Sequence, residues 1–215
     1  MSISSGMMRC SRPVDAKVGV LALQGNVSEH IDAFLLALER MGHGPLSEVF
    51  EIRSPEDLAE CNALALPGGE STTISRLIDK NGLHEPIRRF KGGIFATCAG
   101  MVLMATSVDD PRIHPLGLID MAVDRNAFGR QKESFEMDLG IDSLHGGRFH
   151  AVFIRAPVVT SVGPNVNVLA RIDQGIVAVK QEKHMALSFH PELSDDTRLH
   201  EQFLKNLGLA KTSDC

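Results

Sequence analysis

Short apolar segments alternate with helix-like segments through the first half of this chain, and this alternation constrains the fold more than any other feature. The apolar segments are 18–23, 49–52, 63–66 and 94–97. Continuously apolar runs of this length are typical of strands that are buried on both faces of a parallel sheet. The β-α-β-α order therefore predicts an α/β fold with a mainly parallel central sheet flanked by helices.

Local signals mark where the intervening helices should begin. Asn26 with Glu29 three residues later has the form of a capping box. Ser54 followed by Pro55 favours the start of a short helix after the second strand. Ser71 is positioned to cap the helix that follows the third strand. Each predicted strand of the first half is thus followed by a predicted helix.

The second half has a different pattern, because its apolar segments follow one another closely. They are 149–155, 167–172, 176–180 and 185–189. Short turns such as Asp173-Gln174 favour antiparallel pairing, so we expect an antiparallel addition to the sheet. A final helix should be capped by Ser194-Asp195-Asp196 and run to Gly208.

The length and composition predict a single domain. The chain has 215 residues, is 43% hydrophobic, and contains no internal repeat and no linker-like segment. This is enough to bury one sheet with its flanking helices. We expect the domain to cover residues 17–208, with a disordered N-terminal extension at 1–16 and a tail at 209–215.

The charge pattern and the cysteines exclude several classes of partner. The net charge is −5, no basic stripe is present, and the chain lacks Trp and Tyr, so we expect no nucleic-acid partner. No segment reads as a signal peptide or a transmembrane helix, so we expect no membrane association. The four cysteines lack paired spacing, which favours reduced thiols and a cytoplasmic location. They are Cys10, Cys61, Cys98 and Cys215.

Cys98 is the strongest candidate for a chemical role. It ends the strand 94–97 and is followed at once by Ala99-Gly100. A strand that stops on a nucleophile and turns directly into a helix has the geometry of a nucleophile elbow, which needs small neighbours. The turn presents the thiol to solvent and directs helix N–H groups toward whatever the sulfur attacks.

A second candidate motif, His190-Pro191-Glu192, directly follows the apolar run 185–189. A thiol, an imidazole and a carboxylate at strand ends can form a catalytic triad. In an extended segment, positions two apart face the same side, so we expect Glu192 to orient the His190 ring. The other histidines lack metal-like spacing, and we predict no metal site.

Four motifs together resemble the class I glutamine amidotransferases and, within them, the glutaminase subunits of pyridoxal 5'-phosphate synthase. The motifs are Pro67-Gly68-Gly69-Glu70-Ser71-Thr72-Thr73, Thr97-Cys98-Ala99-Gly100, Arg125-Asn126-Ala127-Phe128-Gly129-Arg130-Gln131 and His190-Pro191-Glu192-Leu193. Leu21-Ala22-Leu23-Gln24-Gly25 and Ile154-Arg155-Ala156-Pro157 also match. The resemblance covers roughly residues 17–207. It departs from the family at Ala96, where glycine is usual.

The resemblance implies a single-domain amidotransferase fold and the hydrolysis of L-glutamine to L-glutamate and ammonia. Cys98 would be the nucleophile, His190 the proton shuttle and Glu192 its orienting partner. Backbone N–H groups of Gly69 and Ala99 would stabilise the oxyanion. The family pattern assigns substrate binding to Gly69, Glu70, Ser71, Arg125, Ile154 and Arg155.

The resemblance further implies a partner and no cofactor. The ammonia would pass to a separate synthase subunit, a TIM barrel, for pyridoxal 5'-phosphate (vitamin B6) biosynthesis. Gln24-Gly25-Asn26 and the helix after it are candidates for sensing that subunit.

Two alternatives remain open at this stage. A related elbow-cysteine hydrolase, such as a γ-glutamyl hydrolase or a peptidase, would act without an ammonia acceptor. A non-catalytic regulatory subunit would keep the fold without the activity.

Overall fold

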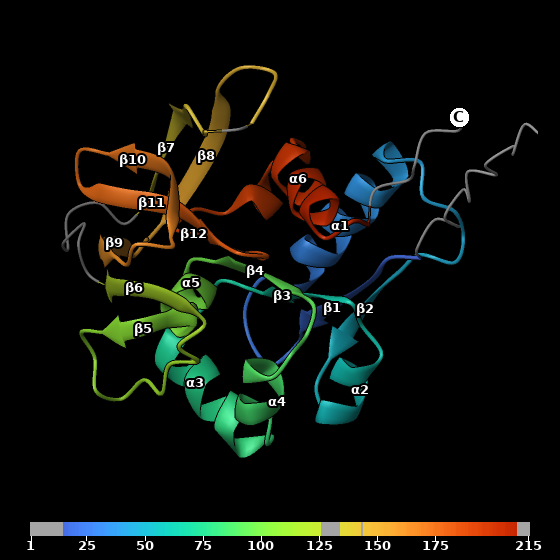
Figure 1. The fold of residues 1–215 in the computed structure, drawn as a ribbon, viewed down its shortest axis with the longest axis horizontal. Coiled ribbons are helices and arrows are strands. Elements are labelled where there is room, and N and C mark those ends of the chain that lie inside the picture. Colours follow the sequence, from blue (N-terminus) through green and yellow to red (C-terminus); the bar gives the residue numbers. More distant parts are fainter. Residues whose placement is uncertain (1–14, 126–133, 143, 210–215) are drawn as a thin grey trace, which may run out of the picture.

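The structure is a computed structural model that describes residues 15–125, 134–142 and 144–209 (Figure 1). One half of its central sheet is parallel, with the strand order β2-β1-β3-β4-β12. These strands are β1 (Lys17–Leu21), β2 (Glu48–Ile52), β3 (Ala63–Leu66), β4 (Gly93–Thr97) and β12 (His184–Leu187). Every residue of β3, β4 and β12 is buried, which explains their continuous apolar runs.

The other half of the sheet is mixed. From β12 the order continues through β11, β9, β6 and β5, while β10 pairs with β11. The strands are β5 (Ala105–Val108), β6 (Ile119–Asp124), β9 (Val158–Val162), β10 (Asn167–Ile172) and β11 (Gly175–Gln181). β7 (Ser134–Leu139) and β8 (Phe149–Ile154) form a separate antiparallel pair. The predicted antiparallel addition is therefore confirmed, although the sequence did not indicate β5, β6, β7 or β9.

Helices cover both faces of the sheet (Figure 1). α1 (Val27–Arg40) and α6 (Arg198–Asn206) pack on one face. The other face is covered by α2 (Pro55–Ala59), α3 (Ser71–Lys80), α4 (His84–Arg88) and α5 (Ala99–Met104). The predicted α/β class, with helices flanking a mainly parallel sheet, is confirmed. No helix in the described part of the chain is long and apolar enough to cross a membrane.

The helix starts differ in part from the predicted caps. Ser54 does form a capping box with Asp57 at the start of α2. Ser71 is not the cap of α3: Glu70 takes that position, and its carboxylate accepts the N–H groups of Thr72 and Thr73. The predicted capping box of Asn26 is also absent, because the Asn26 side chain makes no cap hydrogen bond.

The domain limits predicted from sequence fall mostly on residues outside the described ranges. Of the expected extension, only Asp15 and Ala16 are described, and of the expected tail only Leu209. Ala16 is fully buried and its N–H donates to Ser47 Oγ, while Leu209 packs into the core beside α6. All the strands and helices described above lie between Ala16 and Leu209.

Two buried histidines, His30 of α1 and His200 of α6, lie between the sheet and these covering helices. His200, on α6, is fully buried, and its ring centroid lies 4.9 Å from those of Phe34 and Phe95. Neither of its ring nitrogens has a hydrogen-bond partner among the described residues. Burial lowers the pKa of His200 to about 3, so this imidazole is neutral in the folded protein.

His200→Leu should weaken the dependence of stability on acid. The unfolded chain binds a proton at this histidine near pH 6.5, whereas the folded protein does so only near pH 3. Between these values the unfolded state therefore holds one more proton, and stability falls as the pH falls. Between pH 7.5 and 5 the variant should lose about 2 kcal/mol less unfolding free energy than the wild-type protein does.

Urea unfolding at several pH values measures this difference. His145→Leu, at an exposed position, controls for the loss of a histidine from the chain. Equal slopes of stability against pH for His200→Leu and the wild type would contradict the prediction.

Candidate active site

The carboxyl ends of four parallel strands converge at one edge of the sheet. β1 leads to Gln24 and Asn26, β3 to the loop 67–70, β4 to Cys98 and β12 to His190. This is the edge at which open α/β sheets bind ligands. Residues that are distant along the chain are thereby collected in one place.

Cys98 forms the turn between β4 and α5, as predicted. Its φ of 48° and ψ of −107° lie in a region that residues with a side chain rarely adopt, so the backbone is strained there. The Cys98 N–H donates to the Leu187 carbonyl of β12 at 2.8 Å, which helps to hold the turn. A Cβ atom on Gly100 would lie 2.2 Å from the Leu66 carbonyl oxygen, so only glycine fits at this second position of α5.

His190 and Glu192 form a buried pair. Nδ1 of His190 lies 2.6 Å from Oε1 of Glu192, and the residues are 4% and 6% exposed. The predicted extended segment is wrong, because Pro191–Leu193 forms a 3₁₀ turn. The proline at its first position favours that turn, which folds the Glu192 carboxylate back onto the imidazole.

The electrostatics of this pair favour charge separation. Burial alone would lower the pKa of the His190 imidazole, but its hydrogen bonds to Cys98 and Glu192 raise it to about 10. Burial would likewise raise the pKa of Glu192, but His30 and His190 outweigh burial and lower it to about 2. A protonated imidazole beside Cys98 stabilises a thiolate, which is the nucleophilic form of cysteine.

Asn26 is a site residue that the sequence reasoning did not identify as such. Its Nδ2 lies 3.3 Å from Oε1 of Glu192 and 3.4 Å from Nδ1 of His190. An asparagine at the start of a helix most often caps that helix, and this was the prediction. The resemblance also made residues 24–26 candidates for sensing the synthase, and the place of Asn26 after a strand at the ligand-binding edge was the sequence signal for a role in the site itself.

The glycine-rich loop after β3 packs directly against Cys98 and His190. A Cβ atom on Gly68 would lie 2.4 Å from Cε1 of His190 and 3.2 Å from Cβ of Cys98. Gly69 has a φ of 153°, and Gln24 Oε1 accepts the N–H of Glu70 at 2.9 Å. The missing side chains let the loop backbone approach the sulfur closely, as an oxyanion site requires.

The two predicted oxyanion residues belong to the two segments that adjoin Cys98, the start of α5 and the glycine-rich loop. Ala99 is the first residue of α5, where N–H groups have no partner within the helix. Gly69 belongs to the loop beside Cys98.

Arg125 and Glu70, both predicted to bind substrate, contact each other. Nη2 of Arg125 lies 3.1 Å from Oε1 of Glu70, and Nη1 contacts Oδ2 of Asp110. Burial would raise the pKa of the Glu70 carboxyl, but the combined hydrogen bonds from Thr72 and Thr73 outweigh it and lower the pKa to about 2. This ion pair therefore joins the loop after β3 to the segment after β6.

The remaining predicted residues divide between the site and its surroundings. The Ile154 carbonyl lies 3.7 Å from the Cys98 sulfur. Arg155 follows it with a φ of 45°, a second positive value in a residue with a side chain. Ser71 is buried at the first position of α3. The remainder of the motif that starts at Arg125, residues 126–131, lies outside the described residues.

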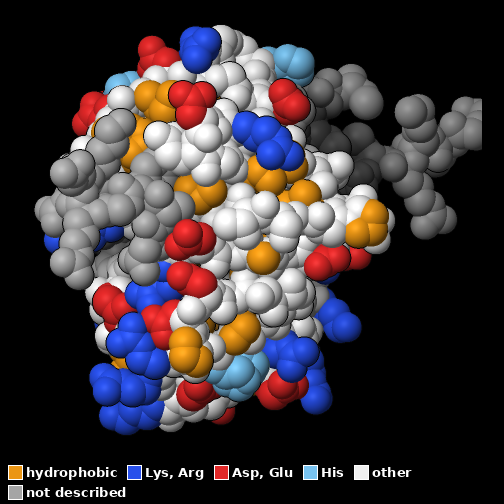
Figure 2. All heavy atoms as spheres, turned by 90° about the vertical axis from the view of Figure 1, so that its left-hand side faces the viewer, with side chains coloured by type: hydrophobic (Ala, Val, Ile, Leu, Met, Phe, Trp, Pro, Cys, Tyr) orange, Lys and Arg blue, Asp and Glu red, His pale blue; other side chains and the backbone are white. Residues whose placement is uncertain are grey.

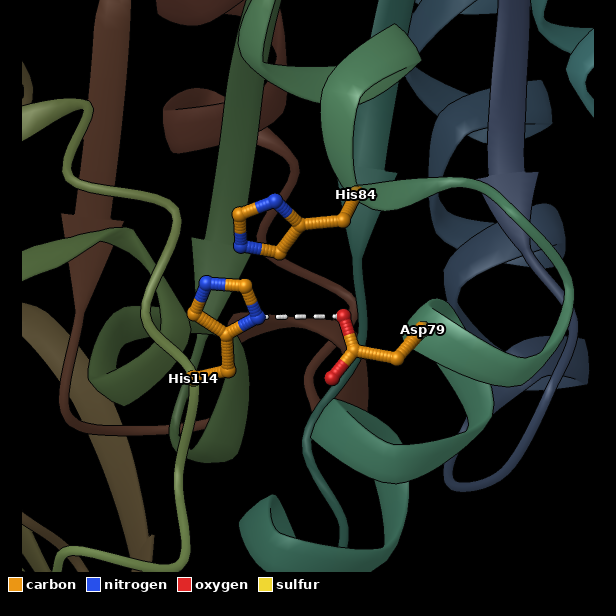
Figure 3. A group of neighbouring side chains, drawn as sticks. All are labelled: Asp79, His84 and His114. Atoms are coloured by element: carbon orange, nitrogen blue, oxygen red, sulfur yellow. Dashed lines mark hydrogen bonds and ion pairs between the residues drawn. The ribbon is translucent and has the colours of Figure 1, made fainter.

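Asp79, His84 and His114 form a separate cluster of neighbouring side chains, with Asp79 on α3, His84 on α4 and His114 in the loop before β6 (Figure 3). The two imidazole rings stack with centroids 3.8 Å apart and planes 11° apart, and His114 Nδ1 lies 3.2 Å from the Asp79 carboxylate. Lone pairs of ring nitrogens lie in the ring plane, so two stacked rings do not aim at a common metal ion. Nε2 of His84 also contacts the Pro115 carbonyl at 3.2 Å. These contacts connect α3, α4 and the loop before β6 to one another. That the protein has no metal site stays a prediction.

The surface over β5, β6 and β10 carries interspersed acidic and basic side chains, with hydrophobic side chains scattered among them (Figure 2). Among the described residues on this face, the basic side chains alternate with acidic ones and form no continuous basic stripe. The expectation that nucleic acid is not a partner stays a prediction.

Comparison with known proteins identifies the family. Residues 20–209 match the SNO glutamine amidotransferase family. The chain is 71% identical over 193 residues to "Pyridoxal 5'-phosphate synthase subunit PdxT" of Methanoregula boonei, covering 90% of this chain and all of the relative. It is 64% identical over 196 residues to the protein of the same name in Methanosphaerula palustris, covering 91% of this chain and all of that relative.

A solved structure described as a glutamine amidotransferase superposes with a TM-score of 0.78 at 45% identity, covering 89% of this chain and 98% of the other. The elbow at Cys98 and the His190–Glu192 pair point to the same family as these similarities do. The chain belongs to the SNO glutamine amidotransferase family.

Proposed function

We propose that this protein hydrolyses the side-chain amide of L-glutamine to L-glutamate and ammonia, and delivers the ammonia to a synthase subunit that makes pyridoxal 5'-phosphate. The observation that carries the proposal is the Cys98 elbow packed against the buried His190–Glu192 pair. The names of the relatives, pyridoxal 5'-phosphate synthase subunits, support the acceptor.

The reaction starts with acyl transfer to Cys98. The thiolate attacks the amide carbon of glutamine, and the oxyanion that forms accepts hydrogen bonds from the N–H groups of Gly69 and Ala99. The C–N bond then breaks while His190 gives its proton to the leaving nitrogen, so ammonia departs. The products of this half-reaction are ammonia and a γ-glutamyl thioester on Cys98.

Water completes the cycle. Neutral His190 takes a proton from water as the oxygen attacks the thioester carbon, and the C–S bond breaks. Glutamate leaves and the thiolate–imidazolium pair is restored. Glu192, which is ionised, keeps the imidazole in the tautomer whose Nε2 faces the reacting atoms.

The amino-acid end of glutamine needs a positive and a negative partner. Arg125 and Glu70 face each other at 3.1 Å beside the glycine-rich loop and offer both charges. We assign the α-carboxylate to Arg125 and the α-ammonium to Glu70, with Ser71, Ile154 and Arg155 lining the remainder of the subsite. Glutamine would then replace a pairing that already exists within the protein.

The partner in this proposal is a separate TIM-barrel synthase subunit, and the complex works in the cytoplasm. The free thiol of Cys98 supports a reducing compartment. The synthase is proposed to dock near the site. Gln24 and Asn26, the candidates for sensing it, lie in the loop that leads into α1, at the same edge of the sheet as the site.

The direct test is glutamate and ammonia release from L-glutamine by the purified chain, alone and with its synthase subunit. Equimolar release that rises strongly with the synthase supports the proposal. Partner-independent hydrolysis of γ-glutamyl peptides at a higher rate than glutamine would support a free-standing hydrolase instead. No release under either condition would contradict glutaminase activity.

Gly68→Ala should impair hydrolysis without unfolding the protein. The added methyl group would meet the His190 ring at 2.4 Å, so the ring must move away from Cys98. Displacement of a reacting group by about 1 Å costs on the order of 100-fold in rate. We expect a loss of this size in kcat, measured by glutamate release with the synthase present.

Gly44→Ala is the matched control for this variant. A Cβ atom there meets nothing within 4 Å, so hydrolysis should be unchanged. Wild-type kcat in Gly68→Ala would show that the loop does not constrain His190.

A further inference from the structure

His30, a buried histidine of α1, lies directly behind the proposed catalytic pair. Its side chain is fully buried, and its Nε2 lies 3.4 Å from Oε1 of Glu192. The same nitrogen lies 3.0 Å from Oγ1 of Thr97, the last residue of β4 before Cys98. His30 follows Asn26 by one helical turn, so both residues project from the same side of the start of α1 toward Glu192.

His30 is neutral at neutral pH. Burial lowers its pKa below 6.5, and this effect exceeds the rise caused by Glu192. The other charged or titratable groups that face it are His190, which lowers the pKa further, and Glu29, which raises it. His200 approaches from α6 and is itself neutral. At neutral pH His30 therefore presents Glu192 with a polar N–H group at 3.4 Å, and it attracts the carboxylate as a cation only where it is protonated.

The surroundings select one tautomer of this neutral ring. Nε2 faces two oxygens, those of Glu192 and Thr97, whereas Nδ1 has no partner among the described residues. A proton on Nε2 gives these oxygens a donor. A proton on Nδ1 would bury an unpaired N–H and turn a lone pair toward a carboxylate, which costs more.

Glu192 depends on such donors because burial isolates it from water. Its Oε1 receives His190 Nδ1 at 2.6 Å, with Asn26 Nδ2 at 3.3 Å and His30 Nε2 at 3.4 Å. Its Oε2 has no partner in the described part of the chain. A buried carboxylate that loses a donor becomes easier to protonate, and a protonated carboxyl no longer holds the imidazolium form of His190.

We infer that His30 is a positioning residue for the proposed glutaminase reaction: its Nε2–H holds the Glu192 carboxylate ionised and in the rotamer that orients His190. This inference rests on the proposed function for its kinetic consequence. It adds a fourth side chain, on a different helix, to the proposed Cys98, His190 and Glu192. Thr97 connects the same nitrogen to the elbow strand.

Three variants separate this role from a purely structural one. His30→Leu removes the donor and keeps an apolar side chain of moderate size in the site. His30→Gln keeps an N–H donor at nearly the reach of Nε2. His200→Leu is the matched control, because it replaces a fully buried histidine of the same cluster that makes no hydrogen bond to Glu192.

The first readout is glutamate release with the synthase present, as kcat and KM across pH. For His30→Leu we expect kcat to fall about 10-fold, with KM within about 2-fold. A loss of about 10-fold is typical when a residue that orients a functional side chain, without contacting the substrate, is removed. The acidic limb of its kcat profile should move to higher pH. His30→Gln should recover most of the loss, and His200→Leu should match the wild type.

The second readout does not depend on glutamine hydrolysis. Alkylation of Cys98 by iodoacetamide follows the thiolate fraction, so its pH profile reports the thiolate–imidazolium pair. In His30→Leu the profile should move to higher pH, with slower alkylation in mildly acidic buffer, and His30→Gln should restore it.

The outcomes distinguish the two proposals. If the wild-type protein releases no glutamate, the proposed function fails, while the alkylation profiles still decide the role of His30. Wild-type kcat and alkylation profiles in His30→Leu would overturn the inference. Equal losses in His30→Leu, His30→Gln and His200→Leu, in step with their melting temperatures, would also overturn it, because they indicate a structural role only.

Discussion

Cys98→Ala should abolish the release of glutamate from glutamine. The proposed reaction has no other nucleophile at this place, and loss of the nucleophile in a triad removes on the order of 10⁶-fold in kcat. The variant should keep its fold, since Cys98 is a small residue between β4 and α5 and alanine is smaller still. Glutamate release, measured with the synthase present, is expected to fall to the background of the assay.

Cys61→Ala is the control for this experiment. Cys61 is the other described free cysteine, and burial raises the pKa of its thiol to about 11, so it carries little thiolate at neutral pH. Hydrolysis should be unchanged in this variant. Residual activity of Cys98→Ala above the assay background, or a large loss in Cys61→Ala, would assign the nucleophile elsewhere.

Glu192→Gln should reduce kcat by roughly 10³- to 10⁴-fold, as replacement of the orienting carboxylate does in triads of this type. The amide has nearly the same shape, so the loss would come from charge and from hydrogen-bond direction. Its NH₂ group would be able to face Nδ1 of His190 and favour the wrong tautomer. Without the carboxylate, the pKa of His190 should fall from about 10, because the hydrogen bond and the attraction of Glu192 both raise it.

The pH dependence gives this prediction a second signature. The pKa of Glu192 is about 2, so in the wild type this carboxylate stays ionised from mildly acidic to alkaline pH. In Glu192→Gln, alkylation of Cys98 by iodoacetamide should require higher pH, because a neutral His190 no longer stabilises the thiolate. Glu39→Gln, which changes an exposed carboxylate of α1, should leave both kcat and alkylation unchanged. A kcat of Glu192→Gln within 10-fold of the wild type would argue against the orienting role.

Much of the parallel half of the fold could be predicted because its signals are local. The run 63–66 matches β3 residue for residue, and the short turn at Asp173-Gln174 does join β10 to β11. The elbow could also be predicted, since a strand, a nucleophile and small residues are adjacent in sequence. These features depend on residues that are neighbours along the chain.

What the sequence did not reveal depends on contacts between distant segments. Asn26 and His30 reach Glu192 only because α1 packs against the turn after β12. Glu70, and not Ser71, caps α3, and the same carboxylate contacts Arg125 from a distant segment of the chain. β7 was missed although its residues alternate between polar and apolar, because it lacks the continuous apolar run of the central strands and its partner β8 lies outside the main sheet.

The place of β12 in the sheet has a consequence for the newly made chain. β12 lies next to β4, with Met185 paired to Phe95, and is the last of the described strands to leave the ribosome. Until it inserts, Cys98 has neither the Leu187 carbonyl that holds its turn nor His190, its proposed proton shuttle. On the proposed function, the thiol of the nascent protein therefore lacks its activating partner through most of its synthesis. Its reactivity arises only when the final part of the domain closes the sheet.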